Sequence, residues 1–278
     1  MSQYIVVAGA GGVGSCVVAM LRSAGHAVIA TVLNDDEERA VIAQDPDVEC
    51  LRLDLSDADG VLIALKQRIE SLDRLDGIAV CGAVAPFGPL ETAPLSMARR
   101  TFEINVLSDL AIFQAGLPAL RKTGGRLTMV SSMAGKASMP FVGAYSASKF
   151  ALEGLADAMR REVSAQGVSI SLVLPGGIKT PMVENQLRDN AAAIARLTPE
   201  EDGLYGALYR GFQTAAQQSH TGGASEPEAV AEAVVTALTG PDPKPRYIVG
   251  EDAKQLIDTA DAMADEELDA MFSQMFVG

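Results

Sequence analysis

Short apolar runs alternate with longer segments of helical character from residue 4 to about residue 250. The runs are rich in β-branched residues, and several are apolar at nearly every position, as parallel strands covered on both faces are. The predicted strands span residues 4–8, 27–33, 49–53, 77–81, 126–131, 169–174 and 246–249. This alternation predicts one α/β domain over residues 1–278, with a doubly wound, seven-stranded parallel sheet and helices on both faces.

The residues between the apolar runs indicate two helix ends and one long segment without a strand pattern. Gly25 is the expected C-terminal cap of the first helix, and Ser225-Glu226-Pro227-Glu228 is the expected capping box of a helix that runs to Leu238. No strand pattern occurs between residues 180 and 223. Long excursions in compact domains are commonly functional, so we expect a substrate lid at about 180–222, and a helical tail at about 252–278.

Composition narrows the class of protein. Hydrophobic residues make up 48% of the 278 residues, which is globular, and the formal charge of −14 argues against nucleic acid or anionic membranes as partners. No apolar stretch is long enough for a membrane span, and the first residues read as a strand rather than a secretory signal. The chain has three cysteines without a C-x-x-C pair and only two histidines, so we expect a cytoplasmic protein without a metal site.

The stretch "VVAGAGGVGSCVVAML", residues 6–21, joins the first strand to the first helix. Glycines at this turn let backbone N–H groups and a helix N-terminus approach a pyrophosphate. The letters form a literal G-x-G-x-x-G, but Gly9, Gly12 and Gly14 also fit a different turn that is one residue short. Either interpretation makes this turn the candidate dinucleotide site, with the residues Gly9, Gly11, Gly12, Val13 and Gly14.

The fifth strand leads to the candidate chemistry. Ser131 and Ser132 end the strand, and Tyr145 and Lys149 follow at a spacing that puts both on one face of a helix. A free tyrosine titrates near about 10, and a nearby ammonium favours the phenolate and lowers that pKa. With a serine hydroxyl to hold a substrate oxygen, the set can exchange a proton with an alcohol or ketone.

These motifs together resemble the classical short-chain dehydrogenases/reductases, a family of Rossmann-fold oxidoreductases that move hydride between NAD(P) and a carbonyl or hydroxyl carbon. Nearly the whole chain takes part in the resemblance. It rests on the glycine turn and, in order, on "LDL" at 53–55, "FEINV" at 102–106, "VSSMAG" at 130–135, "YSASK" at 145–149 and "LPGGIKTPM" at 174–182.

The resemblance implies a role for each matching residue. Tyr145 is the expected catalytic acid or base, Lys149 holds the nicotinamide ribose, Ser132 orients the substrate oxygen, and Asn105 joins the proton relay. The remaining expected cofactor contacts are Thr31, Asp54, Leu55, Pro175, Gly176, Ile178 and Thr180. The family also implies a homodimer or homotetramer. "PFVGAYSASKFALEGLADAMRREV" and "KPRYIVGEDAK" at 244–254 are similar to the hydroxysteroid and retinol dehydrogenase branch, which implies a small apolar alcohol or ketone as substrate.

The chain departs from the family pattern at three places. The usual Thr-Gly-x-x-x-Gly-x-Gly is one residue shorter and lacks the threonine, and Asn-Asn-Ala-Gly is replaced around Val80-Cys81-Gly82-Ala83. Four acids, Asp35 to Glu38, follow the second strand, and we expect no base near enough to receive a 2′-phosphate, which favours NAD(H) over NADP(H).

Three functions remain open at this point. The first is an NAD(P)-dependent enzyme that interconverts an apolar secondary alcohol and its ketone. The second is a non-catalytic binding or regulatory protein of the same fold, favoured by the altered glycine turn and the missing asparagines. The third is an epimerase or dehydratase that keeps its NAD, although such enzymes normally carry a larger substrate domain. A dehalogenase of this fold ranks lower, because it would have arginine in place of Lys149.

Overall fold

The computed structural model describes residues 1–277. Its seven strands form one sheet in which every neighbouring pair is parallel, in the order β3-β2-β1-β4-β5-β6-β7. The strands are β1 (Gln3–Val7), β2 (Ala27–Val32), β3 (Glu49–Arg52), β4 (Gly77–Val80), β5 (Arg126–Val130), β6 (Ser169–Pro175) and β7 (Arg246–Val249). Each lies within one residue of its predicted bounds, so the predicted α/β fold is confirmed.

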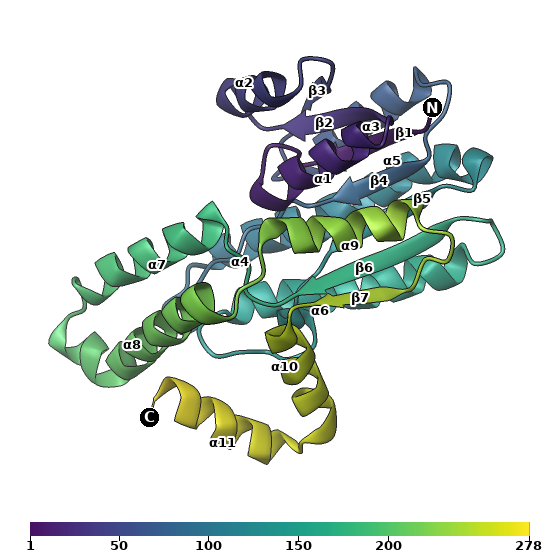
Figure 1. Ribbon diagram of the computed structural model, residues 1–278. Coiled ribbons are helices and arrows are strands. Elements are labelled where there is room, and N and C mark those ends of the chain that lie inside the picture. Colours follow the sequence, from purple (N-terminus) through teal and green to yellow (C-terminus); the bar gives the residue numbers. More distant parts are fainter. Residues whose placement is uncertain (278) are drawn as a thin grey trace.

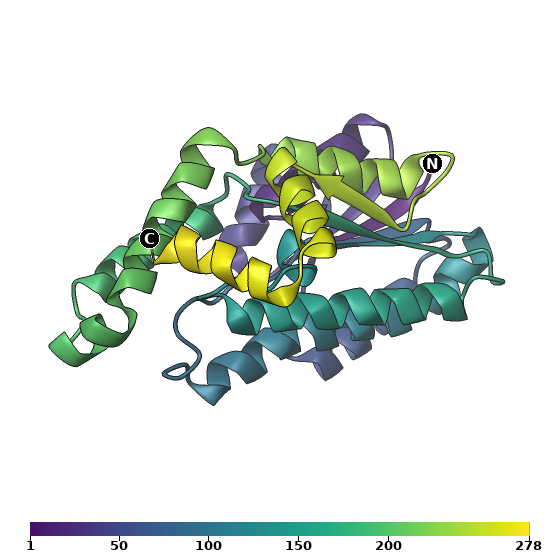
Figure 2. The same cartoon turned by 90° about the horizontal axis from the view of Figure 1, so that it is seen from below.

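Helices cover the sheet on both faces, as Figures 1 and 2 show. One face is packed by α3 (Ala58–Glu70), α5 (Ser108–Thr123) and α6 (Gly143–Glu162), which bury side chains such as Leu65, Ile112 and Leu152 against β1, β4 and β5. The other face is packed by α1 (Gly12–Ser23), α2 (Asp35–Gln44) and α9 (Pro227–Thr239). Because strand residues alternate between these two cores, the central strands are largely apolar.

The order in which successive strands are added to the sheet reverses beside β1. From β1 the chain proceeds outward through β2 to β3, then returns to place β4 on the other side, with Ile5 paired to both Ile29 and Ile78. The connections after β1 and β4 therefore leave the sheet in opposite senses. In open α/β sheets the crevice at such a point, outside the carboxyl ends of the strands, is where ligands bind.

The remaining helices lie mostly beyond this carboxyl edge. They are α4 (Leu95–Phe102), α7 (Pro181–Ile194), α8 (Pro199–Gly222), α10 (Glu251–Ala262) and α11 (Asp265–Phe276). A π-helical turn, Glu103–Leu107, joins α4 to α5, and a 3₁₀ turn, Met133–Gly135, follows β5. The region expected as a lid is thus the helix pair α7 and α8, which projects away from the sheet, with α11 beside α8 (Figure 1).

The two predicted helix ends have different outcomes. Gly25 follows α1 with a φ of +80°, as a C-terminal glycine should. The predicted capping box is wrong, because the N-cap of α9 is Glu226 and no side chain caps it. Ser225 instead uses its backbone to bind the loop after β6, donating its N–H to Gly177 O at 2.8 Å and accepting from Lys179 N at 3.0 Å.

Within residues 1–277, no helix combines the length and the apolar character that crossing a bilayer requires.

Candidate active site

The chain turns sharply directly after β1 because of the backbone conformation of Ala8, so a longer loop is not needed. Ala8 adopts a left-handed φ of +58°, which reverses the chain directly after the strand. The Ala8 N–H donates to Thr31 Oγ1 at 2.9 Å, and the Gly9 N–H donates to Thr31 O at 2.9 Å. Thr31 is buried, and its hydroxyl and its carbonyl oxygen both hold the turn in place.

Two of the glycines are required by close packing. A methyl group on Gly14 would collide with the carbonyl of Ala8, and one on Gly9 would lie 2.7 Å from the Ala30 side chain. Gly11 is far less confined, because its added methyl would meet only Ala8 O, at 3.3 Å. Positions 9 and 14 therefore allow the short turn to form.

Beyond the turn, the start of α1 is built to receive an anion. Its N-cap, Gly11, supplies no side-chain hydrogen bond, and the N–H groups of Gly12, Val13 and Gly14 precede any intrahelical acceptor. A methyl added to Gly12 would lie 3.1 Å from Thr180 Cγ2, so the start of α7 faces the start of α1. This narrow, uncapped cradle fits the pyrophosphate of a dinucleotide.

Tyr145 and Lys149 lie on the first turns of α6, next to the end of β5. Lys149 is 1% exposed; its Nζ donates to Val130 O at 2.9 Å and lies 5.9 Å from the centre of the Tyr145 ring. Ser132, just after β5, accepts a hydrogen bond from Ala134 N at 3.1 Å and also bonds the half-buried Tyr145 side chain. The structure thus brings together the serine, tyrosine and lysine named from the sequence.

The electrostatics of this trio differ from the expectation. Burial raises the pKa of Tyr145, and the hydrogen bond with Ser132 opposes that shift. Burial also lowers the pKa of Lys149, against the attraction of Asp109 and Glu153. The net shift of the Tyr145 pKa is therefore upward, opposite to the lowering expected from the sequence, because desolvation outweighs the opposing effect of Ser132.

Asn105 connects two segments that border the cluster of Ser132, Tyr145 and Lys149. It lies in the π-helical turn, fully buried, where its Oδ1 accepts from Val84 N at 2.9 Å and its Nδ2 donates to Val84 O at 2.8 Å. The same Nδ2 donates to Ser148 Oγ at 3.0 Å, and Ser148 Oγ donates to Tyr145 O at 2.6 Å. Asn105 thereby ties the loop after β4 to the turn of α6 that carries Tyr145.

Two groups near this site, the buried Asp109 and the partly buried Cys81, were not among the functional residues named from the sequence. Asp109 lies in the first turn of α5 and is 2% exposed, and burial raises its pKa to about 7 although the Lys149 ammonium opposes the shift. Burial likewise raises the pKa of the Cys81 thiol to about 12. The only available signal was an acid one turn after Asn105, on a helix whose neighbouring positions are apolar.

The remaining expected cofactor residues lie at the carboxyl ends of their strands. Asp54, after β3, is exposed and accepts from the N–H and the hydroxyl of Ser56, which lowers its pKa. Leu55 borders Gly82, where an added methyl would collide with the leucine. Pro175 ends β6, and Gly176, Ile178 and Thr180 form the connection from β6 to α7.

The surroundings of β2 correct one expectation. Arg52, at the end of β3, forms ion pairs with Asp35 and Glu38, and Arg39 pairs with Asp36. The expectation that no base lies nearby is therefore wrong, because strand pairing brings a distant arginine to the acids of α2.

A cavity of about 440 Å³ opens between the loop after β4, α4 and α7. Its apolar wall includes Val84, Phe87, Met97 and Met182, and its polar side includes Arg100 and Asp189. A cluster of aromatic rings links Phe87 to the helix pair; it comprises Phe87, Phe141, Tyr209 and Phe212, with ring centres 4.5 to 6.0 Å apart. Gln186 on α7 also donates to Ala85 O. The helix pair therefore packs onto the loop beside the candidate site.

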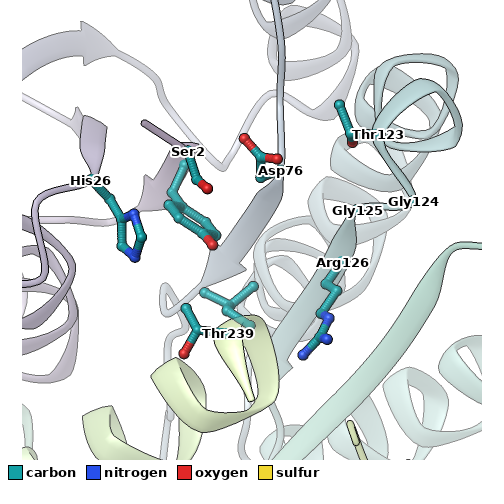
Figure 3. A pocket seen from close by; sticks show the side chains of 10 residues that line it. Ser2, His26, Asp76, Thr123, Gly124, Gly125, Arg126 and Thr239 are labelled. Atoms are coloured by element: carbon teal, nitrogen blue, oxygen red, sulfur yellow. The ribbon is translucent and has the colours of Figure 1, made fainter. Parts of the chain in front are cut away.

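A second cavity, of about 340 Å³, lies at the opposite edge of the sheet (Figure 3). It is lined by Tyr4 and Arg126, near the beginnings of β1 and β5, and by Asp76, just before β4. Its charged groups already have partners, since Asp76 pairs with Arg74 and Arg126 donates to Ala237 O. No group of His, Cys, Asp or Glu in residues 1–277 is arranged to hold a metal ion.

The sheet order, the uncapped start of α1 and the clustered Ser132, Tyr145 and Lys149 define a dinucleotide-binding α/β protein of the oxidoreductase type. Residues 3–191 match the sequence model of a family described as short chain dehydrogenase, and the chain belongs to that family. The resemblance found in the sequence is thereby confirmed.

Named relatives agree with the indicated branch. The chain is 33% identical over 202 residues to 17-beta-hydroxysteroid dehydrogenase type 1 of Mus musculus, covering 72% of this chain but only 56% of the mouse protein. It is 27% identical over 260 residues to retinol dehydrogenase 7 of Rattus norvegicus, covering 91% and 82% of the two chains. A short chain dehydrogenase from Burkholderia cenocepacia, solved in complex with NADP, has the same fold, with a TM-score of 0.74, 20% identity and coverage of 100% and 98%.

Proposed function

We propose that this protein is an NAD(P)-dependent oxidoreductase that interconverts an apolar secondary alcohol and its ketone, with Tyr145 as the acid and base. The observation that carries the proposal is the convergence of Ser132, Tyr145 and Lys149 at the carboxyl edge of the sheet, where the uncapped start of α1 also lies. A protein that only binds the cofactor has no need for this trio, nor for Asn105 bracing it.

The residues present fit a nicotinamide dinucleotide. The amides of Gly12, Val13 and Gly14 would hold the pyrophosphate, and the exposed Asp54 carboxylate would contact the adenine. Lys149 would hold the nicotinamide ribose, because its ammonium has two further N–H donors besides the one bonded to Val130 O. Pro175, Gly176, Ile178 and Thr180 would border the nicotinamide half, because they lie at the end of β6.

The bound nicotinamide would supply hydride transfer, which no side chain provides. In the oxidative direction Tyr145 takes the hydroxyl proton of the alcohol, and in the reductive direction it returns a proton to the ketone oxygen. Ser132 would form a hydrogen bond with that oxygen and also forms one with the Tyr145 side chain, which keeps the substrate and the tyrosine together. Lys149 adds a nearby positive charge that favours the phenolate when the Tyr145 proton leaves.

An apolar substrate is supported by the cavity and by its relatives. The wall formed by Val84, Phe87, Met97 and Met182 suits a hydrophobic body, while helices α7 and α8 act as a lid held by the aromatic cluster. Two relatives are named for hydroxysteroid and retinol substrates, which are bulky alcohols of this kind.

We favour NAD(H) as the cofactor. Asp35 and Glu38 already occupy Arg52, so a 2′-phosphate would have to break these pairs and approach the acids of α2. Replacing Arg52 with alanine should then leave NADH binding nearly unchanged, since the arginine serves the acids and not the cofactor.

We also place the protein in the cytoplasm as a homodimer or homotetramer. Cys16, Cys50 and Cys81 are all free, as expected for a reducing compartment. Leu107 and Phe150 are each 45% exposed at the π-helical turn and on α6, which supplies apolar surface for a subunit contact.

Fluorescence titration with NADH and with NADPH tests binding, and the reduced-nicotinamide absorbance then reports turnover. The substrate panel contains steroid, retinoid, aromatic and aliphatic alcohols and ketones. We expect binding of NADH tighter than of NADPH and turnover with a bulky apolar member. Binding of neither cofactor would favour the regulatory function instead, and tighter binding of NADPH would overturn the cofactor choice alone.

A further inference from the structure

The loop between β6 and α7 is fixed to the rest of the protein at Gly176 and Gly177. The Gly176 N–H donates to Val249 O at 3.0 Å, and the Gly177 N–H donates to Asp252 Oδ2 at 2.7 Å. Gly177 O accepts from Ser225 N at 2.8 Å. Three backbone hydrogen bonds and one carboxylate hold this loop, since Lys179 N also donates to Ser225 O at 3.0 Å, and the carboxylate comes from the second residue of α10.

The neighbouring glycines leave a space that the Asp252 carboxylate fills. A methyl group on Gly176 or on Gly250 would collide with Asp252 Oδ1, and one on Gly177 would collide with Ser219 Oγ. Gly250 also has a φ of +98°, which favours glycine. Two glycines from separate loops, Gly176 and Gly250, therefore make room for a side chain of this length.

The Asp252 carboxylate accepts one hydrogen bond, and that bond comes from the loop. Asp252 Oδ1 is buried and has no hydrogen-bond partner among residues 1–277, so the contact with Gly177 is the one that orients the group. Its position in the first turn of α10 stabilises a negative charge there. Buried carboxylate oxygens normally have hydrogen-bond partners, so the one bond that Asp252 makes, from Gly177 N to its Oδ2, indicates a specific role.

The contact between Asp252 and Gly177 acts on the start of α1 through Thr180, which lies three residues after Gly177. Thr180 follows Gly177 closely and faces Gly12 at the start of α1, where an added methyl would lie 3.1 Å from Thr180 Cγ2. Loss of the Asp252 bond would leave this segment held only by its backbone bonds to Val249 and Ser225, which would loosen the position of Thr180 at the uncapped amides of α1.

We propose that Asp252 is a positioning residue for cofactor binding, which sets the β6–α7 loop against the glycine turn through its hydrogen bond from Gly177 N. The inference rests on the proposed function. It also gives a role to the stretch "KPRYIVGEDAK", in which Asp252 lies and for which the dehydrogenase chemistry needs no residue.

Three variants of the full-length protein distinguish geometry from charge. Asp252→Asn keeps an acceptor for Gly177 N, whereas Asp252→Ala removes it and Asp252→Glu keeps the charge but adds a methylene where the glycines leave no space. We expect Asp252→Asn to bind NADH within about threefold of wild type, and Asp252→Ala and Asp252→Glu to bind it about tenfold more weakly. Asp258→Ala, which removes an exposed acid of the same helix, is the matched control and should change nothing.

Fluorescence titration with NADH gives the dissociation constants, steady-state rates separate KM for cofactor from kcat, and thermal unfolding monitors the fold. The proposal predicts a raised KM with kcat nearly unchanged in Asp252→Ala, and rescue in Asp252→Asn. Normal affinity in Asp252→Ala or in Asp252→Glu would overturn it, as would loss of affinity in Asp252→Asn equal to that in Asp252→Glu. If Asp252→Ala does not fold, the Asn and Glu pair decides. Failure of wild type to bind either cofactor would instead refute the proposed function.

Discussion

Replacing Asn105 with alanine should destabilise this protein more than any exposed asparagine could. The fully buried Asn105 side chain makes three hydrogen bonds, with Val84 N, Val84 O and Ser148 Oγ, at 2.8 to 3.0 Å. Alanine at this position makes none of them. The backbone groups of Val84 then lose their side-chain partner at a place where the loop after β4 meets α6.

The size of the effect follows from these three bonds. Each hydrogen bond contributes about 1 kcal/mol net, and a buried backbone group left without a partner costs about 1–3 kcal/mol. The expected loss of unfolding free energy is therefore about 3–5 kcal/mol. For a chain of this size that corresponds to a fall in Tm of roughly 6–20 °C.

Denaturant unfolding of wild type, Asn105→Ala and Asn185→Ala measures the difference. Asn185 is an exposed asparagine of α7 that accepts one bond from Arg188 at 2.8 Å, so its removal should stay within about 0.5 kcal/mol of wild type. A loss of less than about 1 kcal/mol for Asn105→Ala would refute the reasoning, because the bonds would then contribute nothing beyond what water supplies.

Two further predictions concern the glycine turn and pH. Gly14→Ala should lower Tm and weaken NADH binding because its methyl collides with Ala8 O, whereas Gly11→Ala, whose methyl meets only Ala8 O at 3.3 Å, should have a clearly smaller effect on both; equal effects in thermal unfolding and titration would contradict this. The unfolded chain releases the Asp109 proton near pH 4, but the folded protein keeps it until about pH 7. Wild type therefore loses stability relative to Asp109→Asn as pH rises through that window, and a pH-independent difference in unfolding free energy would contradict it.

The strands were predictable because most are short runs that are largely apolar and rich in β-branched residues. Burial on both faces of a parallel sheet favours apolar residues at successive positions, and the predicted ends fell within one residue of the observed ones. The capping of α9 was not predictable in the same way, although its bounds were. Ser225 had the right residue type for a cap, but its backbone is engaged by Gly177 and Lys179, a contact between segments far apart in sequence.

The candidate site shows the same division. Ser132, Tyr145 and Lys149 were found from spacing and resemblance, because one helix and one strand end carry all three. The pairing of Arg52 with Asp35, the bond from Gly177 to Asp252 and the burial of Asp109 each depend on tertiary contacts. The raised pKa of Tyr145 is of this kind too, since desolvation depends on everything packed around the ring.

The shortened glycine turn is explained by two local features. The left-handed Ala8 reverses the chain at once, and the Thr31 hydroxyl of the neighbouring strand receives the Ala8 N–H. A turn with one residue fewer can therefore still present the start of α1 without a cap.

Turnover of Tyr145→Phe compared with wild type tests the central claim most directly. With the best substrate of the panel and saturating cofactor, reduced-nicotinamide absorbance gives both rates, and fluorescence titration confirms that the variant still binds cofactor. Loss of the proton donor and acceptor should lower kcat by about 10²–10⁴-fold while the dissociation constant for NADH stays within about threefold. Turnover of the variant close to that of wild type would contradict the account.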